Sequence, residues 1–450
     1  MKKYGIILLF TLLFLLSACG CEHAGFDTTE NTATATLSTE ESAADNSTQP
    51  QRITQTTLPP VSYEFVFEDD PSVENNDSVS RSIILDASEL RPDNGIWALG
   101  GNRLCFGQYH GLPIVYRILS SPDTQSFEEN KDGLFIDCDY VLELKKFDDN
   151  FRKNDTQINS PSEWMGSDID IWLNSSDFYG NSIIFSDIEK ASILYTTLDE
   201  HVEPYSIGNW TYEDFGSSNY LFLISAAEAN QLYLDNPARV KNGQSVHWWL
   251  RSSFGSIGNG AGSVHEDGHI CNNSISIYGV GVCPALNIDL SAILFASATG
   301  TDKTLDLNEA GAKIDYNTSR KWKLTLLDTS MTVNLTEGKT VMRLDTDAEC
   351  VITVPFTYTG DNANQISVMI TDKPHTDCSA QVLYYGALQG ISMDCFTDAG
   401  TFTLPSQLER QICGENYYVY IIAEAVNGCY ETDYASEFCE IFIPAASAAG

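Results

Sequence analysis

Short runs in which hydrophobic and polar residues alternate recur along the chain after residue 60, and this period of two predicts β-strands. The first clear pair covers Arg103 to Gly107 and Pro113 to Leu119, with a turn at His110-Gly111 between the strands. From Trp322 onward, further runs follow one another at the spacing expected of a β-sandwich. They are Trp322 to Leu327, Met331 to Leu335, Val351 to Thr357, Gln365 to Ile370, Gln381 to Tyr385, Thr401 to Leu404, Tyr417 to Ala423 and Phe438 to Ile443.

Two short helices interrupt the strands of the first half. A glutamate follows Ser186 by three residues, and another follows Ser225 by three, and this capping-box spacing predicts helices at about residues 187–193 and 226–233. Strands that flank helices in this order indicate an α+β domain. We expect that domain at residues 61–298, with its core at 84–298, then a linker at 299–321, a β-sandwich at 322–444 and a tail at 445–450.

The segment from Val246 to Leu290 holds the candidates for a binding surface. If Trp248 begins a strand, alternation places Trp249 and Arg251 together on one face. Arg251 can then contact a ligand, or it can act as a structural clamp that forks onto a carboxylate or a carbonyl. A glycine-rich loop follows, and Asp267-Gly268 predicts a tight turn. The residues that we interpret as lining a binding face are Trp249, Arg251, Asn259 and Asp267.

Residues His265 to His269 spell H-E-x-x-H, which binds zinc where the motif is helical and both imidazoles share one face. The Asp267-Gly268 signal predicts a hairpin instead, with the two histidines facing each other across a turn. No third ligand follows at the spacing of a zinc protease. We interpret His247 as a structural histidine, because nothing nearby forms a metal-type cluster.

The N-terminus has the features of an export signal. Lys2 and Lys3 precede an apolar run, Ile6 to Leu16, that is too short to span a bilayer comfortably. The run ends in Leu-Ser-Ala-Cys19, which resembles a bacterial lipobox: residues 1–18 would be the signal peptide and Cys19 the lipidated residue, with ordinary signal cleavage nearby as the alternative. Residues 19–60 are rich in Thr and Ser and predict a disordered stalk. We therefore expect a protein on the outer face of the cytoplasmic membrane, held there only by its lipid anchor.

Charge and cysteine content narrow the choice of partners. The formal net charge of -37 disfavours nucleic acids and anionic lipid headgroups. No motif calls for a cofactor, although surface carboxylates could hold Ca²⁺.

Apart from Cys19 and Cys21, cysteines occur in even numbers in each predicted domain, which favours disulfides in an exported chain. Cys271 and Cys283 could form one such bond across the hairpin.

Five sequence blocks between residues 84 and 298 occur together in a fixed order: F-G-Q-Y-H-G-L-P-I-V-Y-R-I-L (Phe106 to Leu119), D-I-D-I-W-L-N (Asp168 to Asn174), Y-L-F-L-I-S-A-A-E-A (Tyr220 to Ala229), W-W-L-R-S (Trp248 to Ser252) and V-C-P-A-L-N-I-D-L (Val282 to Leu290). In these five blocks and their order, the chain resembles an uncharacterised family of bacterial surface proteins, domain-of-unknown-function family 6273. The resemblance implies an α+β fold distantly similar to C-type lectins and formylglycine-generating enzymes, followed by an all-β immunoglobulin-like sandwich.

These features together favour a surface-anchored lipoprotein that binds an extracellular ligand through the loop face of a lectin-like domain. A glycan or wall polymer is the first expected ligand, since aromatic side chains stack on sugar rings, and a protein or peptide is the second. Neither a G-x-S-x-G elbow nor a C-x-x-C motif occurs, so the sequence favours a binding protein over an enzyme. The rival function, implied by the resemblance to formylglycine-generating enzymes, is a copper oxidase that uses the thiolates of Cys271 and Cys283.

Overall fold

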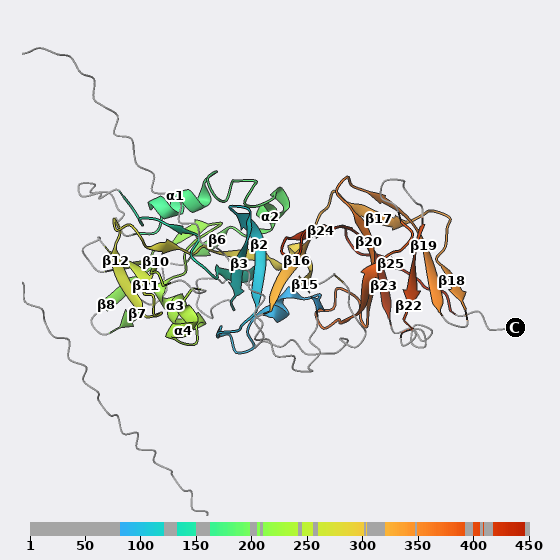
Figure 1. Ribbon diagram of the computed structural model, residues 1–450, viewed down its shortest axis with the longest axis horizontal. Helices are drawn as coiled ribbons and strands as arrows, with labels where there is room; N and C mark the ends of the chain where they lie inside the picture. Colours follow the sequence, from blue (N-terminus) through green and yellow to red (C-terminus); the bar gives the residue numbers. More distant parts are fainter. Residues whose placement is uncertain are drawn as a thin grey trace, which may run out of the picture. The chain divides into compact units, whose positions relative to one another are not determined.

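The computed structural model describes residues 82–120, 133–149, 163–198, 205–207, 210–241, 245–254, 260–300, 303, 320–346, 349–391, 399–405, 408 and 417–445. The expected signal peptide, lipidation site Cys19 and stalk lie outside these residues, as does Asn259. All of the described residues belong to one compact unit, which is mostly β-structure arranged in several sheets (Figure 1). None of the helices found among them is both long and apolar enough to cross a bilayer.

Strands are more common than helices among the described residues, and the named helices all lie between Ala87 and Ala292. The helices are α1 (Asp168–Asn174), α2 (Asp187–Ser192), α3 (Ala226–Leu232) and α4 (Asn236–Arg239), with 3-10 helices η1 (Ala87–Leu90) and η3 (Leu290–Ala292). The strands up to residue 300 are β1 (Ile83–Ile84), β2 (Arg103–Tyr109), β3 (Leu112–Ile118), β4 (Gly133–Cys138), β5 (Glu143–Leu144), β6 (Thr196–Leu198), β7 (Tyr205–Ile207), β8 (Trp210–Glu213), β9 (Ser217–Asn219), β10 (Trp248–Phe254), β11 (Gly260–Val264), β12 (Ile270–Ser274), β13 (Gly281–Val282), β14 (Ala285–Asp289) and β15 (Ile293–Ala298). The later strands are β16 (Lys321–Leu327), β17 (Thr332–Leu335), β18 (Met342–Asp345), β19 (Cys350–Thr359), β20 (Gln365–Thr371), β21 (Val382–Ala387), β22 (Ala399–Leu404), β23 (Tyr418–Ala425), β24 (Asp433–Ala435) and β25 (Cys439–Ile441).

The predicted helices and the first predicted turn are confirmed. In both α2 and α3 the capping box is complete, because the serine hydroxyl accepts from the glutamate N–H and the glutamate carboxylate accepts from the serine N–H. The turn between β2 and β3 has positive φ at His110 (52°) and Gly111 (78°), which is the left-handed geometry of a two-residue hairpin turn. The capping-box and turn rules held because each describes hydrogen bonds of backbone groups that are only a few residues apart in the sequence.

The largest sheet has 12 strands and runs through both halves of the chain in the order β14-β4-β3-β2-β16-β24-β23-β20-β21. One edge of β16 pairs with β15 along its length. Its other edge pairs in parallel with β2 at Lys321 to Lys323 and then with β24 at Thr325 to Leu327. β16 is therefore the strand that joins the two halves into one sheet.

The run that opened the predicted sandwich, Trp322 to Leu327, packs in the core of the first half. Trp322, Leu324 and Leu326 are buried in the same cluster as the side chains of β2 and β3. The indole N–H of Trp322 donates to the amide oxygen of Asn102 at 3.1 Å. Alternation identified the strand correctly, but it carries no information about which sheet a strand joins.

The remaining strands of the second half surround a separate core: β17, β18, β19 and β22 form a four-stranded sheet, and β20, β21, β23 and β25 belong to the 12-stranded sheet. β18 and β22 pair with β19, as does β17, while β20 pairs with β21 and β23. Buried side chains from both sheets meet in one cluster, among them Ile352, Phe356, Val368 and Ile421. Seven of the predicted runs correspond to strands here; β18 and β24, which are short, were not predicted.

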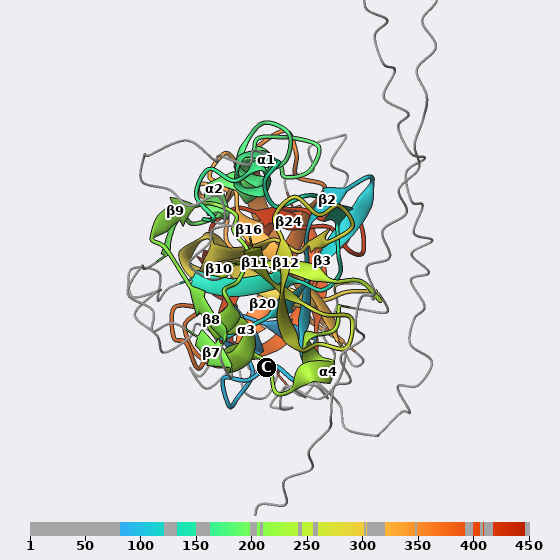
Figure 2. The same cartoon turned by 90° about the vertical axis from the view of Figure 1, so that its left-hand side faces the viewer.

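A second sheet carries the predicted binding segment. It has the order β12-β11-β10-β13-β5, with β8 on the far end of β10 and β7 beyond it. The double-tryptophan segment is extended as predicted, in β10. α1 and α2 lie beyond one side of this sheet and α3 and α4 beyond the opposite side (Figure 2).

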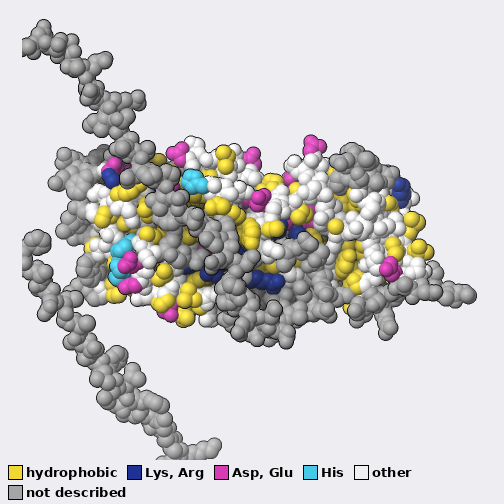
Figure 3. All heavy atoms as spheres, in the orientation of Figure 1, with side chains coloured by type: hydrophobic (Ala, Val, Ile, Leu, Met, Phe, Trp, Pro, Cys, Tyr) yellow, Lys and Arg dark blue, Asp and Glu magenta, His cyan; other side chains and the backbone are white. Residues whose placement is uncertain are grey.

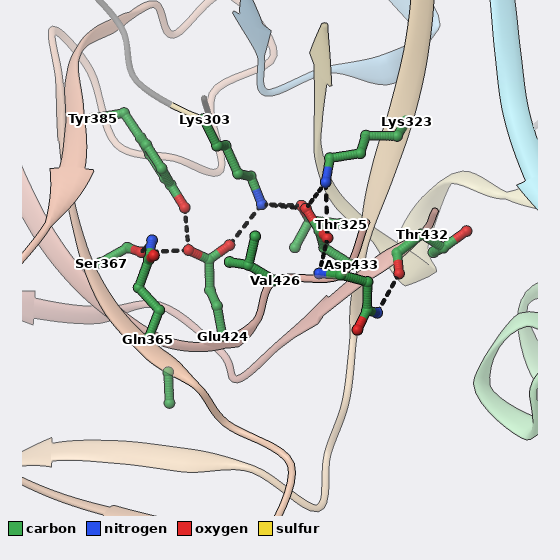
Figure 4. Close-up of polar contacts among 12 residues, drawn as sticks. Lys303, Lys323, Thr325, Gln365, Ser367, Tyr385, Glu424, Val426, Thr432 and Asp433 are labelled. Atoms are coloured by element: carbon green, nitrogen blue, oxygen red, sulfur yellow. Dashed lines mark hydrogen bonds and ion pairs between the residues drawn. The ribbon is translucent and has the colours of Figure 1, made fainter. Parts of the chain in front are cut away.

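Buried charges hold the two halves together where β16 meets β24 (Figure 4). Lys303 contacts Glu424 at 2.7 Å and Asp433 at 2.9 Å, and Lys323 also contacts Asp433 at 2.9 Å. Both carboxylate side chains are completely buried, and the hydroxyls of Ser367 and Tyr385 donate to Glu424. Two lysines and two carboxylates thus balance one another inside the protein.

Substitution of Lys323 by Met should strongly destabilise the protein, because it leaves two buried carboxylates facing a single ammonium group. Breaking a buried ion pair typically costs about 3–5 kcal/mol. Urea unfolding monitored by tryptophan fluorescence measures this loss. The matched control is Lys146→Met, since Lys146 and Asp149 form an exposed pair for which the expected loss is below about 1 kcal/mol. Equal effects of the two substitutions would contradict the assignment of a structural role to the network.

Candidate functional site

Arg251 is a structural clamp inside the protein. Its guanidinium binds Glu228 of α3 in bidentate fashion, with Nη1 at 2.5 Å from Oε2 and Nη2 at 2.7 Å from Oε1. Nη1 also donates to the carbonyl oxygen of Leu223 at 3.0 Å. Burial alone would lower the pKa of Arg251, but the carboxylates of Glu228 and Asp214 outweigh burial and raise it. Of the two roles that the sequence left open, the structure shows the clamp.

Trp249 is also a core residue, with no exposed surface. Its indole N–H donates to the carbonyl oxygen of Lys145 at 2.9 Å, and its ring packs edge-on against Phe147 with centroids 5.5 Å apart. The interpretation of Trp249 and Arg251 as an exposed face is corrected: side chains on both faces of β10 are buried, so alternation separates two buried sides. Asn259, the third predicted residue, lies outside the described residues.

Of the three predicted residues that the structure describes, only Asp267 is exposed, at the tip of the predicted hairpin. The N–H of His265 donates to the carbonyl oxygen of His269 at 2.9 Å, and the N–H of Gly268 donates to that of His265 at 2.8 Å. Gly268 has a φ of 86°, which favours glycine. His265 to His269 therefore form the turn between β11 and β12, and the helical zinc-protease geometry is absent from this segment.

The hairpin tip rests against α4. Arg239 donates through Nη1 to the carbonyl oxygen of Gly268 at 3.1 Å. A Cβ on Gly268 would lie 1.7 Å from the carbonyl oxygen of Asn236, so the two backbones touch closely there. The tip is thus held on the body of the protein, although it lies far from the sheet centre.

Three histidines gather at this tip. The rings of His265 and His269 stack with centroids 4.5 Å apart, and the ring of His247 meets that of His265 at 4.4 Å. Oδ1 of Asp267 lies 3.0 Å from Nδ1 of His265 and 2.5 Å from Nδ1 of His269. Figure 3 shows histidine and acidic side chains next to one another on this part of the surface. His265, Asp267 and His269 could hold a metal ion, because one ligand atom from each lies within 4.8 Å of the others.

His247 has the polar contacts of a structural histidine, with Nδ1 3.2 Å from the amide nitrogen of Asn273, but its ring also meets that of His265. Trp248 pairs with Val264 in the β10–β11 ladder, so the next residues outward, His247 and His265, come side by side. The missing signal was the register of two strands, which the sequence reading did not use. The turn prediction together with that register could have found the cluster.

Cys271 and Cys283 are free and do not form the expected disulfide. Cys271 lies in β12 and Cys283 follows β13, and strands β11 and β10 stand between them. Three strand spacings amount to about 14 Å, whereas the Cα atoms of a disulfide lie within about 7 Å. Burial raises the pKa of both thiols, that of Cys283 to about 12. The two sulfurs cannot share a copper ion in this arrangement.

A cluster of tyrosines missed by the sequence reading lies on a separate two-stranded ribbon formed by β6 and β9 (Figures 1 and 2). Tyr195 and Tyr220 flank its last pair, and their ring centroids are 4.9 Å apart. Tyr179 also stacks on Tyr220, with ring centroids 4.3 Å apart and 9° between the ring planes. Tyr195 is 58% exposed. Because the three rings come from three distant segments, no local pattern indicates the cluster.

Hydroxyl groups continue this aromatic surface along the ribbon. Thr197 and Ser218 form the cross-strand pair two residues from Tyr195 and Tyr220, so they lie on the same face as the tyrosines. Their oxygens are 3.3 Å apart and exposed. The opposite face carries Thr196 and Leu198, which are buried. One face of the ribbon therefore offers aromatic rings and hydroxyl groups to the solvent.

Comparison with known proteins found a family match for the central part of the chain. Residues 133–290 match the model of a domain of unknown function, DUF6273. This range contains the hairpin tip, the β6–β9 ribbon and four of the five sequence blocks that suggested the resemblance. No curated protein and no solved structure matches the chain significantly. The stretch from Gly133 to Leu290 thus matches the family that the sequence blocks indicated.

Proposed function

We propose that the protein is an exported, lipid-anchored binding protein that recognises a neutral glycan on the tyrosine face of the β6–β9 ribbon. In this proposal the first half has a fold related to C-type lectins and formylglycine-generating enzymes. The second half is an immunoglobulin-like spacer, in keeping with two sheets that share one core. The observation that carries the proposal is the cluster of Tyr179 and Tyr220, which are stacked, with the tilted ring of Tyr195 next to Tyr220 and exposed hydroxyls beside it.

The chemistry of this face suits a sugar ring. The C–H face of a pyranose packs on an aromatic ring, and its hydroxyls need polar partners at the rim of the contact. Tyr195 offers an exposed ring, while Thr197 and Ser218 offer oxygen atoms on the same face. Tyr179 fixes the stack from behind, because its hydroxyl donates to the carbonyl oxygen of Lys190 at 3.2 Å.

Electrostatics favours a neutral glycan over an anionic wall polymer. The formal net charge of the chain is -37, which repels phosphate-rich or carboxylate-rich polymers. Several of its cations are buried in ion pairs, as Arg251 and Lys323 show.

Replacing Tyr195 by Ala should weaken glycan binding about tenfold, since the loss of one stacked ring corresponds to roughly 1.4 kcal/mol. Tyr220→Ala should weaken binding at least as much, because Tyr220 lies between the other two rings. A glycan array identifies the neutral ligand, and titration calorimetry measures its Kd. Tyr278→Ala is the control, as Tyr278 is 63% exposed on another segment. A wild-type protein that binds no neutral glycan, or a Tyr195 variant that binds normally, would refute the proposal.

Glycan binding should not require Ca²⁺. The four residues of the ribbon face, Tyr195, Thr197, Ser218 and Tyr220, include no carboxylate, which is the ligand that Ca²⁺ needs. Calorimetric titrations in EDTA and in millimolar CaCl₂ should therefore give the same Kd. Loss of binding in EDTA with recovery in CaCl₂ would place the glycan at a different, carboxylate-bearing surface.

A further inference from the structure

We propose that the β11–β12 hairpin tip binds a transition-metal ion of the Zn²⁺ class through His265, Asp267 and His269, with His247 as the fourth ligand. This inference goes beyond glycan recognition, because the tip and the ribbon share none of these residues. Of the seven histidines in the chain, three converge here, and the shared acceptor of two of them is a carboxylate oxygen.

The distances are close to those of a tetrahedral site. Zn–N and Zn–O bonds are about 2.0–2.1 Å long, which sets neighbouring ligand atoms about 3.3 Å apart. Nδ1 of His265 is 3.0 Å from Oδ1 of Asp267, and Nδ1 of His269 is 2.5 Å from the same oxygen. An opening of less than about 1 Å at each side chain would admit the ion, since Asp267 and His269 are exposed and His265 is only half-buried at the turn.

His247 can complete the set from the neighbouring strand. Its ring lies 4.4 Å from that of His265, at an interplanar angle of 76°. Nδ1 of His247 accepts from the amide of Asn273 at 3.2 Å, which leaves the ring proton on Nε2, so Nε2 can bind a metal only when that amide turns its oxygen toward Nδ1. Asn273 also donates to Ser263 at 2.9 Å. With its oxygen turned in this way, the amide would accept from Nδ1–H of His247, as the outer partner of a metal-binding imidazole does.

The turn itself does not account for the imidazoles. Asp267 stabilises the hairpin by accepting the N–H of His269 at 3.1 Å, and Gly268 provides the positive φ. Neither role needs a histidine at 269, and at 265 the turn uses the imidazole only for a long contact of 3.4 Å between Nδ1 and the N–H of Asp267. The contact of Gly268 with Arg239 and Asn236 holds the turn in place, so that the ligand atoms are positioned before an ion binds.

The set of ligands selects the kind of ion. Imidazole nitrogens suit Zn²⁺, Cu²⁺ and Ni²⁺, whereas Ca²⁺ and Mg²⁺ prefer oxygen ligands. The single carboxylate here is too little for a calcium site. Cys271 lies near, with Sγ 3.9 Å from Nδ1 of His247, but that is the nitrogen on the side of Asn273. The proposed site therefore uses nitrogen and oxygen ligands and no sulfur.

Titration calorimetry of the purified full-length chain with ZnCl₂ tests the site. We expect one zinc ion bound at the histidines of each chain. His265→Ala and His269→Ala should each weaken binding at least tenfold, as the removal of a direct ligand does, and His247→Ala should weaken it severalfold. Thermal unfolding with EDTA present shows whether each variant still folds. Zinc should raise the Tm of the wild type and not that of the double variant His265→Ala/His269→Ala.

Two controls make the result specific. His110→Asn changes an exposed histidine at another turn, where asparagine tolerates the positive φ, and zinc binding should be unchanged. Cys271→Ser should also leave zinc binding unchanged. A wild-type protein without bound zinc, or a folded double variant with the wild-type affinity, overturns the proposal. Loss of binding in Cys271→Ser overturns the ligand set. Glycan binding by the double variant should remain normal, so failure of this proposal and failure of the glycan proposal are separate outcomes.

Discussion

A charge removed from water must be compensated where it lies, and this requirement governs the polar residues of the whole structure. It is met by Arg251 with Glu228, by Lys241 with Asp137, by Arg117 with Asp139, and by two lysines with Glu424 and Asp433 at the junction of the halves. In each case one partner would be costly to bury without the other. The arginines and lysines of these buried pairs therefore stabilise the fold.

Because these charged residues are bound in buried pairs, we looked for functional residues in the turns and ribbons at the surface. The hairpin tip and the β6–β9 ribbon both expose side chains whose chemistry the fold does not need: imidazoles in one case and tyrosine rings in the other. Both are attached to rigid neighbours, the tip through Gly268 and the ribbon through Tyr179. A rigid support with exposed, mutually contacting side chains is the arrangement that binding sites favour, because little ordering is needed when a ligand arrives.

Rules that act within a few residues predicted the capping boxes of α2 and α3, the turn at His110 and the hairpin at Asp267 from the sequence. Features that depend on distant segments were not predictable in this way. Alternation predicted on which face of its strand Trp249 lies, but not that other residues cover that face. It also predicted that β16 is a strand, but not which sheet this strand joins. His247 reached its cluster through strand register, and the tyrosines met through tertiary packing alone.

The inferred zinc ligands are imidazoles gathered by a hairpin turn, and not a pair of buried thiols. The zinc K-edge absorption spectrum of the zinc-loaded protein distinguishes these two sets of ligands. We expect a first shell of nitrogen and oxygen atoms only, at about 2.0 Å, with the outer-shell scattering of imidazole rings. A sulfur shell at about 2.3 Å would contradict it, since zinc would then be held by cysteine.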